Sequence, residues 1–186
     1  MGKRQEILDT TLELIAELGF NATPMSLIIK KSNAAAGTIY HYFKNKEDLI
    51  DTLYSELKEE MGKAIIKNIE TELNYKEKFF LIWKNLFEFF IQNPKKFEFI
   101  ENYANSPFVH KEIKAINQRH YQAAIDFFQL GIRIGMLRNL PLYLLINLIF
   151  GNVSSFARMI IMEEIVPTDN LFFDVIQSSW DSVKVI

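Results

Sequence analysis

Residues 38–46 hold the side chains of this sequence that are best suited to contact a polyanion. Thr38 offers a hydroxyl, and Lys46 offers an ammonium group that can neutralise a phosphate. Between them, Tyr40-His41-Tyr42 supplies two phenols and an imidazole. Hydroxyl and imidazole groups form hydrogen bonds with phosphate oxygens and with the edges of bases. This combination predicts contact with nucleic acid.

The sequence offers little for catalysis. It contains three histidines and no cysteine, and its carboxylates are spread over the polar positions of helical patterns. It has no phosphate-cradling glycine loop, no pair of metal ligands at helical spacing and no Gly-X-Ser-X-Gly element. We therefore expect no catalytic residue, no metal site and no cofactor, and we predict that the chain is not an enzyme.

Side chains at 38–42 need other helices behind them. Apolar residues recur at helical spacing over about residues 3–18, and Gly19 is a typical helix end. Thr23-Pro24 predicts the capped start of a second, short helix. Asn33 tolerates a left-handed backbone and suits a tight turn before a third helix at about 35–42.

Two short helices joined by a tight turn predict a helix-turn-helix. Ile39 and Phe43 lie four residues apart in the second of these helices and are expected to face the core. The polar side chains between and around them would then face outward, where a major groove can receive them. These outward residues are Thr38, Tyr40, His41 and Tyr42.

The rest of the sequence is helical in pattern and shows no strand alternation. Helices are expected at about 46–72, 75–92, 95–104, 109–136, 139–163 and 170–184. The fold class predicted is therefore all-α, with about nine helices. We predict a helix-turn-helix domain at 1–46 and a second helical domain at 47–186. Residues 1–46 carry six basic and four acidic groups, whereas the rest of the chain is acidic on balance.

The run from Leu140 to Met162 is long and apolar enough to suggest a membrane span. However, Asn147, Asn152 and two serines interrupt it, and an apolar helix can equally be a core helix that also meets a partner. No apolar run follows Lys3 and Arg4, so no signal peptide is expected. The absence of cysteine is consistent with a reducing compartment. We expect a cytoplasmic protein that does not enter the membrane.

The run from Gly37 to Leu49, GTIYHYFKNKEDL, resembles the recognition helix and following helix start of the TetR family of repressors. The similarity covers about residues 4–54 and includes Gly19-Phe20, Thr23 and Ile28. It implies a homodimer in which each chain has about nine helices. The dimer would bind double-stranded DNA at a palindromic operator, and the second domain of each chain would bind a small-molecule effector. It also assigns DNA contacts to Thr23, Thr38, Tyr40, His41, Tyr42 and Lys46.

The sequence departs from the family pattern in the turn and at the start of the third helix. Asn33 replaces the usual Gly, and Ala35 replaces the usual Ser. The second change removes a helix cap worth about 0.5–2 kcal/mol. Ala36 stands where a polar residue is common, and Ile29 replaces a small Ala. We therefore expect fewer contacts to bases than is usual in the family, with recognition that relies on Tyr40, His41 and DNA shape.

The second domain offers aromatic and buried polar side chains for an effector site. The aromatic residues of this domain form either an ordinary core or the lining of a pocket. Polar residues within its apolar helices are the better candidates for ligand contact, because buried polar groups need hydrogen-bond partners. A flat or greasy ligand would suit such a lining. The predicted effector residues are Trp83, Phe87, Asn102, Tyr103, Gln118, His120, Tyr121 and Asn147.

The last two helices are the expected dimer interface. Gly151 and Ser155 lie four residues apart and would allow another helix to approach closely. Phe172, Ile176 and Trp180 on the last helix would complete a four-helix interface, with packing within one chain as the alternative.

The sequence therefore favours a ligand-responsive transcriptional repressor. The alternative is a DNA-binding regulator that is controlled by a protein partner and has no small-molecule ligand.

Overall fold

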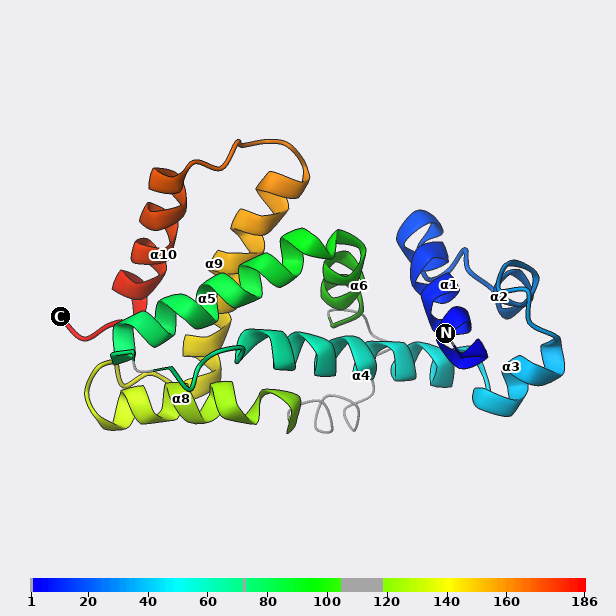
Figure 1. Ribbon diagram of the computed structural model, residues 1–186, viewed down its shortest axis with the longest axis horizontal. Helices are drawn as coiled ribbons and strands as arrows, with labels where there is room; N and C mark the ends of the chain where they lie inside the picture. The colour runs from blue at the N-terminus through cyan, green and yellow to red at the C-terminus, as the bar shows by residue number, and fades with distance from the viewer. Residues whose placement is uncertain (1, 72, 105–118) are drawn as a thin grey trace. The chain divides into compact units, whose positions relative to one another are not determined.

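The computed structural model describes residues 2–71, 73–104 and 119–186. Over these residues the chain forms nine α-helices and one 3-10 helix, with no strand (Figure 1). The all-α prediction is confirmed. The helices pack into two compact units, each built from separate stretches of sequence: of the described residues, 2–59 and 95–104 form the first unit, and 60–71, 73–94 and 119–186 form the second. The division of the chain into domains at residue 46 remains a prediction.

The first unit begins with α1 (Lys3–Leu18), α2 (Met25–Lys31) and α3 (Ala36–Tyr42). Gly19 ends α1 with a φ of 80° and donates its backbone N–H to the carbonyl of Ile15. The turn between α2 and α3 has Asn33 at a φ of 49°, so the predicted left-handed turn is confirmed. The core of the three helices is aliphatic and fully buried, and it includes Ile7, Leu8, Ile28 and Ile39.

Helix α4 (Lys46–Ile65) follows directly. Asn45 caps its start, because its side-chain oxygen accepts a hydrogen bond of 2.7 Å from the backbone N–H of Asp48. The predicted extension to residue 72 is wrong. The chain leaves the helix after Ile65 through a series of turns in which Asn68 adopts a φ of 62°. Helix α6 (Pro94–Ala104) completes the described part of the first unit.

The second unit contains α5 (Tyr75–Gln92), α9 (Leu142–Ile161) and α10 (Asp169–Val183), which pack against one another. A capping box formed by Asn74 and Glu77 fixes the start of α5. Thr168 caps α10 by accepting a hydrogen bond from the backbone N–H of Leu171.

Between α5 and α9 in the sequence, a 3-10 helix η1 (Arg119–Tyr121) leads into α8 (Gln122–Arg133). The helix predicted at 109–136 is therefore observed only in its second half, because residues 105–118 lie outside the described residues. Gly62 allows a close approach at this point, since a Cβ added there would overlap the backbone carbonyl of His120.

Candidate nucleic-acid interface and effector site

Helix α3 separates a buried side from a polar, exposed side. Ile39 is 0% exposed and Phe43 is 1% exposed, so these two side chains hold α3 against the core of the first unit. Tyr40 is 52% exposed and Tyr42 is 42% exposed, and His41 is exposed between them. The prediction that these side chains face outward is confirmed. Thr38, two residues before Tyr40 on the same helix, is half-buried.

The start of α3 has no side-chain cap. Ala35 occupies the N-cap position with an extended backbone and offers no hydrogen bond to the first turn. Only backbone bonds close this turn, from the N–H groups of Thr38 and Ile39 to the Ala35 carbonyl. The loss of the cap that the sequence predicted is confirmed, and α3 depends on Ile39 and Phe43 for its position.

Lys46 begins α4, three residues after Phe43. Its side chain is half-exposed, and its ammonium group donates a hydrogen bond to the backbone carbonyl of Phe20. This bond holds the lysine against the loop between α1 and α2, so the cation is positioned within the same unit as α3. Its predicted contact with a phosphate remains a prediction.

Thr23 has a structural role. Its side chain is fully buried, and its hydroxyl donates to the carbonyls of Leu14, at 3.2 Å, and Gly19, at 2.8 Å. It thereby satisfies carbonyls at the end of α1. Pro24, not Thr23, occupies the N-cap position of α2. The structure corrects two predictions: the Thr23 side chain does not cap α2, and it is not available to contact DNA.

Phe20 and Tyr103 form an aromatic cluster in the first unit that the sequence did not reveal. The ring of Phe20 lies 5.5 Å from that of Phe99 and 5.4 Å from that of Tyr103. The Tyr103 hydroxyl donates to Asp51 at 2.5 Å. Burial, followed by the hydrogen bond to Asp51, raises the pKa of Tyr103 well above its ordinary value. These residues are far apart in the sequence, so no spacing rule links them.

Trp83 and Phe87 form the centre of the second unit. Trp83 is fully buried and stacks on Phe87, with ring centroids 5.6 Å apart. Its indole N–H donates to the side-chain oxygen of Asn152 at 3.1 Å. The rings of Phe156 and Phe172 surround the pair. Asn152 is the polar partner that the sequence-based list missed. It is one of two amides in the apolar helix α9, and the list selected the other, Asn147.

The other predicted effector residues are scattered. Asn102 is exposed in the first unit, where it lines a small hollow, and Tyr103 is buried in that unit. Asn147 is exposed on α9 and donates to the carbonyl of Tyr143 at 2.6 Å, so it does not line the Trp83 core. Gln118 lies outside the described residues. Roles for Trp83, Phe87, His120 and Tyr121 in effector binding remain predictions.

Helix α9 exposes a long stripe on the side that faces away from its own protomer. By length and composition this helix is apolar enough to cross a membrane, and 33% of its most apolar segment is buried within the protomer. Gly151 lies in the stripe, and a Cβ added there would meet no atom within 4 Å. The exposed residues recur every three or four positions, and we call them the α9 stripe: Leu144, Leu148, Gly151, Ser155, Met159 and Met162.

The predicted interface residues on α10 are mostly core residues. Ile176 is 4% exposed and Trp180 is 5% exposed. Trp180 packs edge-on against Phe79 of α5, with ring centroids 5.1 Å apart. The structure corrects their assignment to the dimer interface, because the apolar side of α10 packs within its own protomer. Phe172 is half-buried against Trp83 and Phe87, whereas Phe173 is 56% exposed.

Comparisons with known families agree with this architecture. Residues 7–53 match the bacterial regulatory proteins of the tetR family, and residues 54–185 match the tetracyclin repressor-like C-terminal domain. The second match covers more than half of the chain. The chain belongs to the TetR family. Both matches are to families of bacterial regulators, and they identify no enzyme family.

Two curated relatives place the TetR chain among bacterial regulators. A fatty acid metabolism regulator protein of Bacillus subtilis is 38% identical over 80 residues, which are 43% of this chain and 41% of the relative. A helix-turn-helix transcriptional regulator of Haemophilus influenzae is 30% identical over 103 residues, which are 55% of each chain. The chain thus spans about half the length of these relatives.

Solved structures match the whole TetR fold. A TetR family transcription regulator from Marinobacter aquaeolei has a TM-score of 0.90 at 22% identity, covering 98% of this chain and 95% of its own. The transcriptional regulator FadR from Bacillus subtilis, solved in complex with stearoyl-CoA, has a TM-score of 0.73 at 23% identity and covers 93% and 95%. At these identities the likeness shows the fold alone.

Proposed function

We propose that this TetR-family chain is a cytoplasmic repressor that binds a palindromic operator as a homodimer and leaves it when a small hydrophobic or aromatic effector binds. The observation that carries the proposal is the geometry of α3. The buried residues Ile39, within the helix, and Phe43, just after it, anchor α3, while Tyr40 and His41 extend their polar groups into solvent. Thr38 and Tyr42 flank them, and Lys46 supplies a cation for a phosphate.

A second copy of the chain is the proposed partner for the α9 stripe. Leu148 is 44% exposed and Leu144 is 48% exposed, which is costly for a contiguous row of apolar residues unless something covers it. Gly151 and Ser155 keep the middle of the stripe flat, so that a second α9 can approach closely. Two-fold symmetry of the protein then requires two-fold symmetry of the DNA site.

The second unit supports a proposed hydrophobic effector. Its core consists largely of aromatic rings around Trp83, with the indole bonded to a single amide, Asn152. A core of this composition suits an apolar ligand that is oriented by few polar contacts. Two similar proteins, a regulator of fatty acid metabolism and a FadR bound to stearoyl-CoA, have names consistent with this chemistry.

Selection of bound DNA from a random pool tests the proposal directly. We expect the purified chain to enrich a palindrome whose half-sites lie about 34–36 Å apart or slightly more. Tyr40→Ala, which removes an exposed side chain and leaves Ile39 and Phe43 in place, should not enrich it. A pool that yields no palindrome, or the same palindrome with both proteins, would contradict the assignment of α3 as the reading helix.

A further inference from the structure

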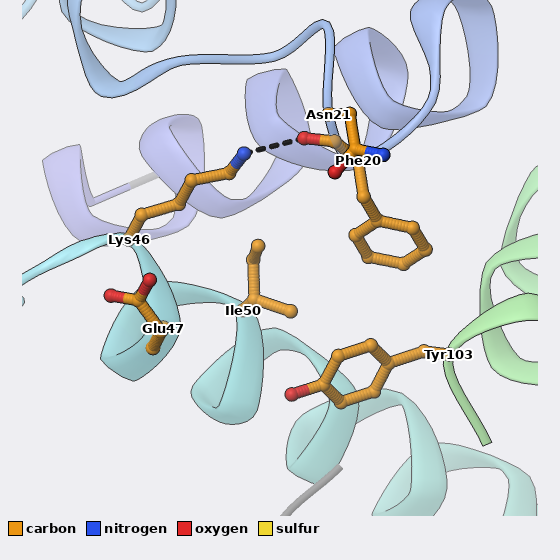
Figure 2. Close-up of a pocket in the computed structure, with 6 residues that line it drawn as sticks. All are labelled: Phe20, Asn21, Lys46, Glu47, Ile50 and Tyr103. Atoms are coloured by element: carbon orange, nitrogen blue, oxygen red, sulfur yellow. Dashed lines mark hydrogen bonds between the residues drawn. The ribbon is translucent and has the colours of Figure 1, made fainter. Parts of the chain in front are cut away.

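A small cleft in the first unit has no assigned role. Its volume is about 190 Å³, and it lies between the loop after α1, the start of α4 and the end of α6 (Figure 2). A cavity of about 150 Å³ holds one benzene ring, whereas sites for drug-sized ligands start at about 300 Å³. The cleft therefore fits one ring with a short polar chain. Its lining consists of Phe20, Asn21, Lys46, Glu47, Ile50 and Tyr103.

One side of the cleft is apolar and aromatic. The rings of Phe20 and Tyr103 lie together, 5.4 Å apart and tilted by 34°. Figure 2 shows the side chain of Ile50 rising from α4 between these rings and Lys46. Aromatic pairs prefer such tilted contacts, so a third ring can join the cluster with favourable geometry.

The other side of the cleft carries both signs of charge and an amide. The Lys46 ammonium group donates to the Phe20 carbonyl, and a carbonyl leaves the positive charge uncompensated. Glu47 is its neighbour in the sequence and is exposed. Asn21 contributes an exposed amide from the opposite loop. A cation and an anion beside an apolar wall favour a ligand that carries both charges, since a singly charged ligand is repelled by one of them.

We propose that this cleft binds a small aromatic zwitterion of the α-amino acid class. The ring packs against Phe20, Ile50 and Tyr103, the carboxylate pairs with Lys46, and the ammonium group pairs with Glu47. The cleft is too small for a long acyl chain, and its lining residues belong to the first unit, whereas Trp83 belongs to the second.

Occupancy of this cleft would also regulate DNA binding, a consequence that rests on the proposed function. The carboxylate of the ligand engages the same Lys46 ammonium group that is proposed to contact a phosphate. A bound ligand therefore competes with that phosphate, and the operator affinity falls by a route that does not use the second unit.

Calorimetric titration of the full chain without DNA tests the site. L-phenylalanine is the probe, and phenylacetate and phenethylamine each lack one of its charges. We expect L-phenylalanine to bind at least 10-fold more tightly than either analogue. Glu47→Gln should weaken it at least 10-fold, whereas Glu164→Gln, the same change at an exposed residue outside the cleft, should not. Equal binding of phenylacetate, or no binding of L-phenylalanine, would overturn the proposal.

A DNA titration separates the site from its regulatory consequence. Saturating L-phenylalanine should weaken operator binding and reduce the slope of log affinity against log salt by up to about 1.8 per dimer, because two phosphate contacts are lost. Unchanged operator affinity in the presence of bound L-phenylalanine would overturn the competition. A chain that binds no DNA would contradict the proposed function, while the calorimetric result still decides the site.

Discussion

The outward sides of α3 and α9 both place large side chains in solvent, but they differ in how those side chains end. On α3, Tyr40 and Tyr42 are apolar rings with a hydroxyl at the tip. On α9, Leu144, Leu148 and Met159 have no polar group at all. Exposure alone therefore does not define an interface. The polar tips suit a wet, hydrogen-bonding DNA groove, whereas the bare apolar row suits a matching protein surface.

Disruption of the α9 stripe should have the largest effect. Leu148→Glu places a carboxylate, twice over by symmetry, in a row that we propose is buried in the dimer, and an unpaired buried charge costs several kcal/mol. We expect the dimer dissociation constant to rise at least 100-fold, measured by sedimentation equilibrium. Leu130→Glu, which changes a leucine of similar exposure on α8, should leave the dimer intact. An unchanged dimer in Leu148→Glu would show that another surface joins the protomers.

Loss of the Tyr40 side chain tests whether the exposed side of α3 contacts DNA. Each specific contact contributes about 1–3 kcal/mol, and a dimer loses two of them, so operator affinity should fall between about 30-fold and about 25,000-fold in Tyr40→Ala. Sedimentation should show that this variant still dimerises. Tyr40→Phe keeps the ring, so a comparable loss in that variant would assign the effect to the hydroxyl. Full affinity in Tyr40→Ala would remove this residue from the DNA contact.

Substitutions of two glycines, one on α8 and one on α9, test whether α9 is open to solvent in the protomer. A methyl group at Gly131 of α8 would overlap the hydroxyl of Tyr75, which donates to the carbonyl of Phe127 at 3.0 Å. Overpacking of this kind costs about 1–3 kcal/mol, so Gly131→Ala should lower the free energy of unfolding by that amount. Gly151→Ala meets no atom of its own protomer, and alanine is the better helix former, so it should not lower the stability of the protomer itself. Any loss of stability in this variant would come from the proposed contact with a second α9. Urea titration measures both.

Removal of the Lys46 charge should have the smallest effect. Lys46→Met loses one proposed phosphate contact per protomer, so the slope of log affinity against log salt should fall in magnitude by about 1.8 per dimer. Base preference should stay the same, because phosphate contacts carry no sequence information. Lys84→Met, on α5 of the second unit, is the matched control. An unchanged slope in Lys46→Met would confine this lysine to its bond with Phe20.

The sequence predicted those parts of the fold that depend on local patterns. The 3.6-residue period located α5 and α6 closely, and the motif around Tyr40 indicated which side of α3 is exposed. Thr23 was misassigned because the hydroxyl of a threonine before proline can either cap the following helix or donate to carbonyls of the preceding one. Only the tertiary path shows that its hydroxyl turns back to Leu14 and Gly19.

Contacts between distant helices were beyond what the sequence could predict. The apolar side of α10 can pack against its own α5 or against a second chain with equal local propensity, so Ile176 and Trp180 were assigned to the wrong neighbour. The bond from Trp83 to Asn152 joins residues 69 positions apart, and the cluster of Phe20 with Tyr103 is likewise assembled by the fold. Spacing rules describe neighbours along one helix and cannot identify such pairs.

The missing cap at Ala35 has a consequence for how new DNA preferences can arise. Helix α3 has only seven residues, too few to persist alone, and its place is fixed by Ile39 and Phe43 beneath it. The demands of folding and of recognition therefore fall on different residues of one short segment. If Tyr40, His41 and Tyr42 contact DNA as proposed, substitutions there can change the preferred sequence while the scaffold stays intact. This lineage can then acquire new target genes without first acquiring a new architecture.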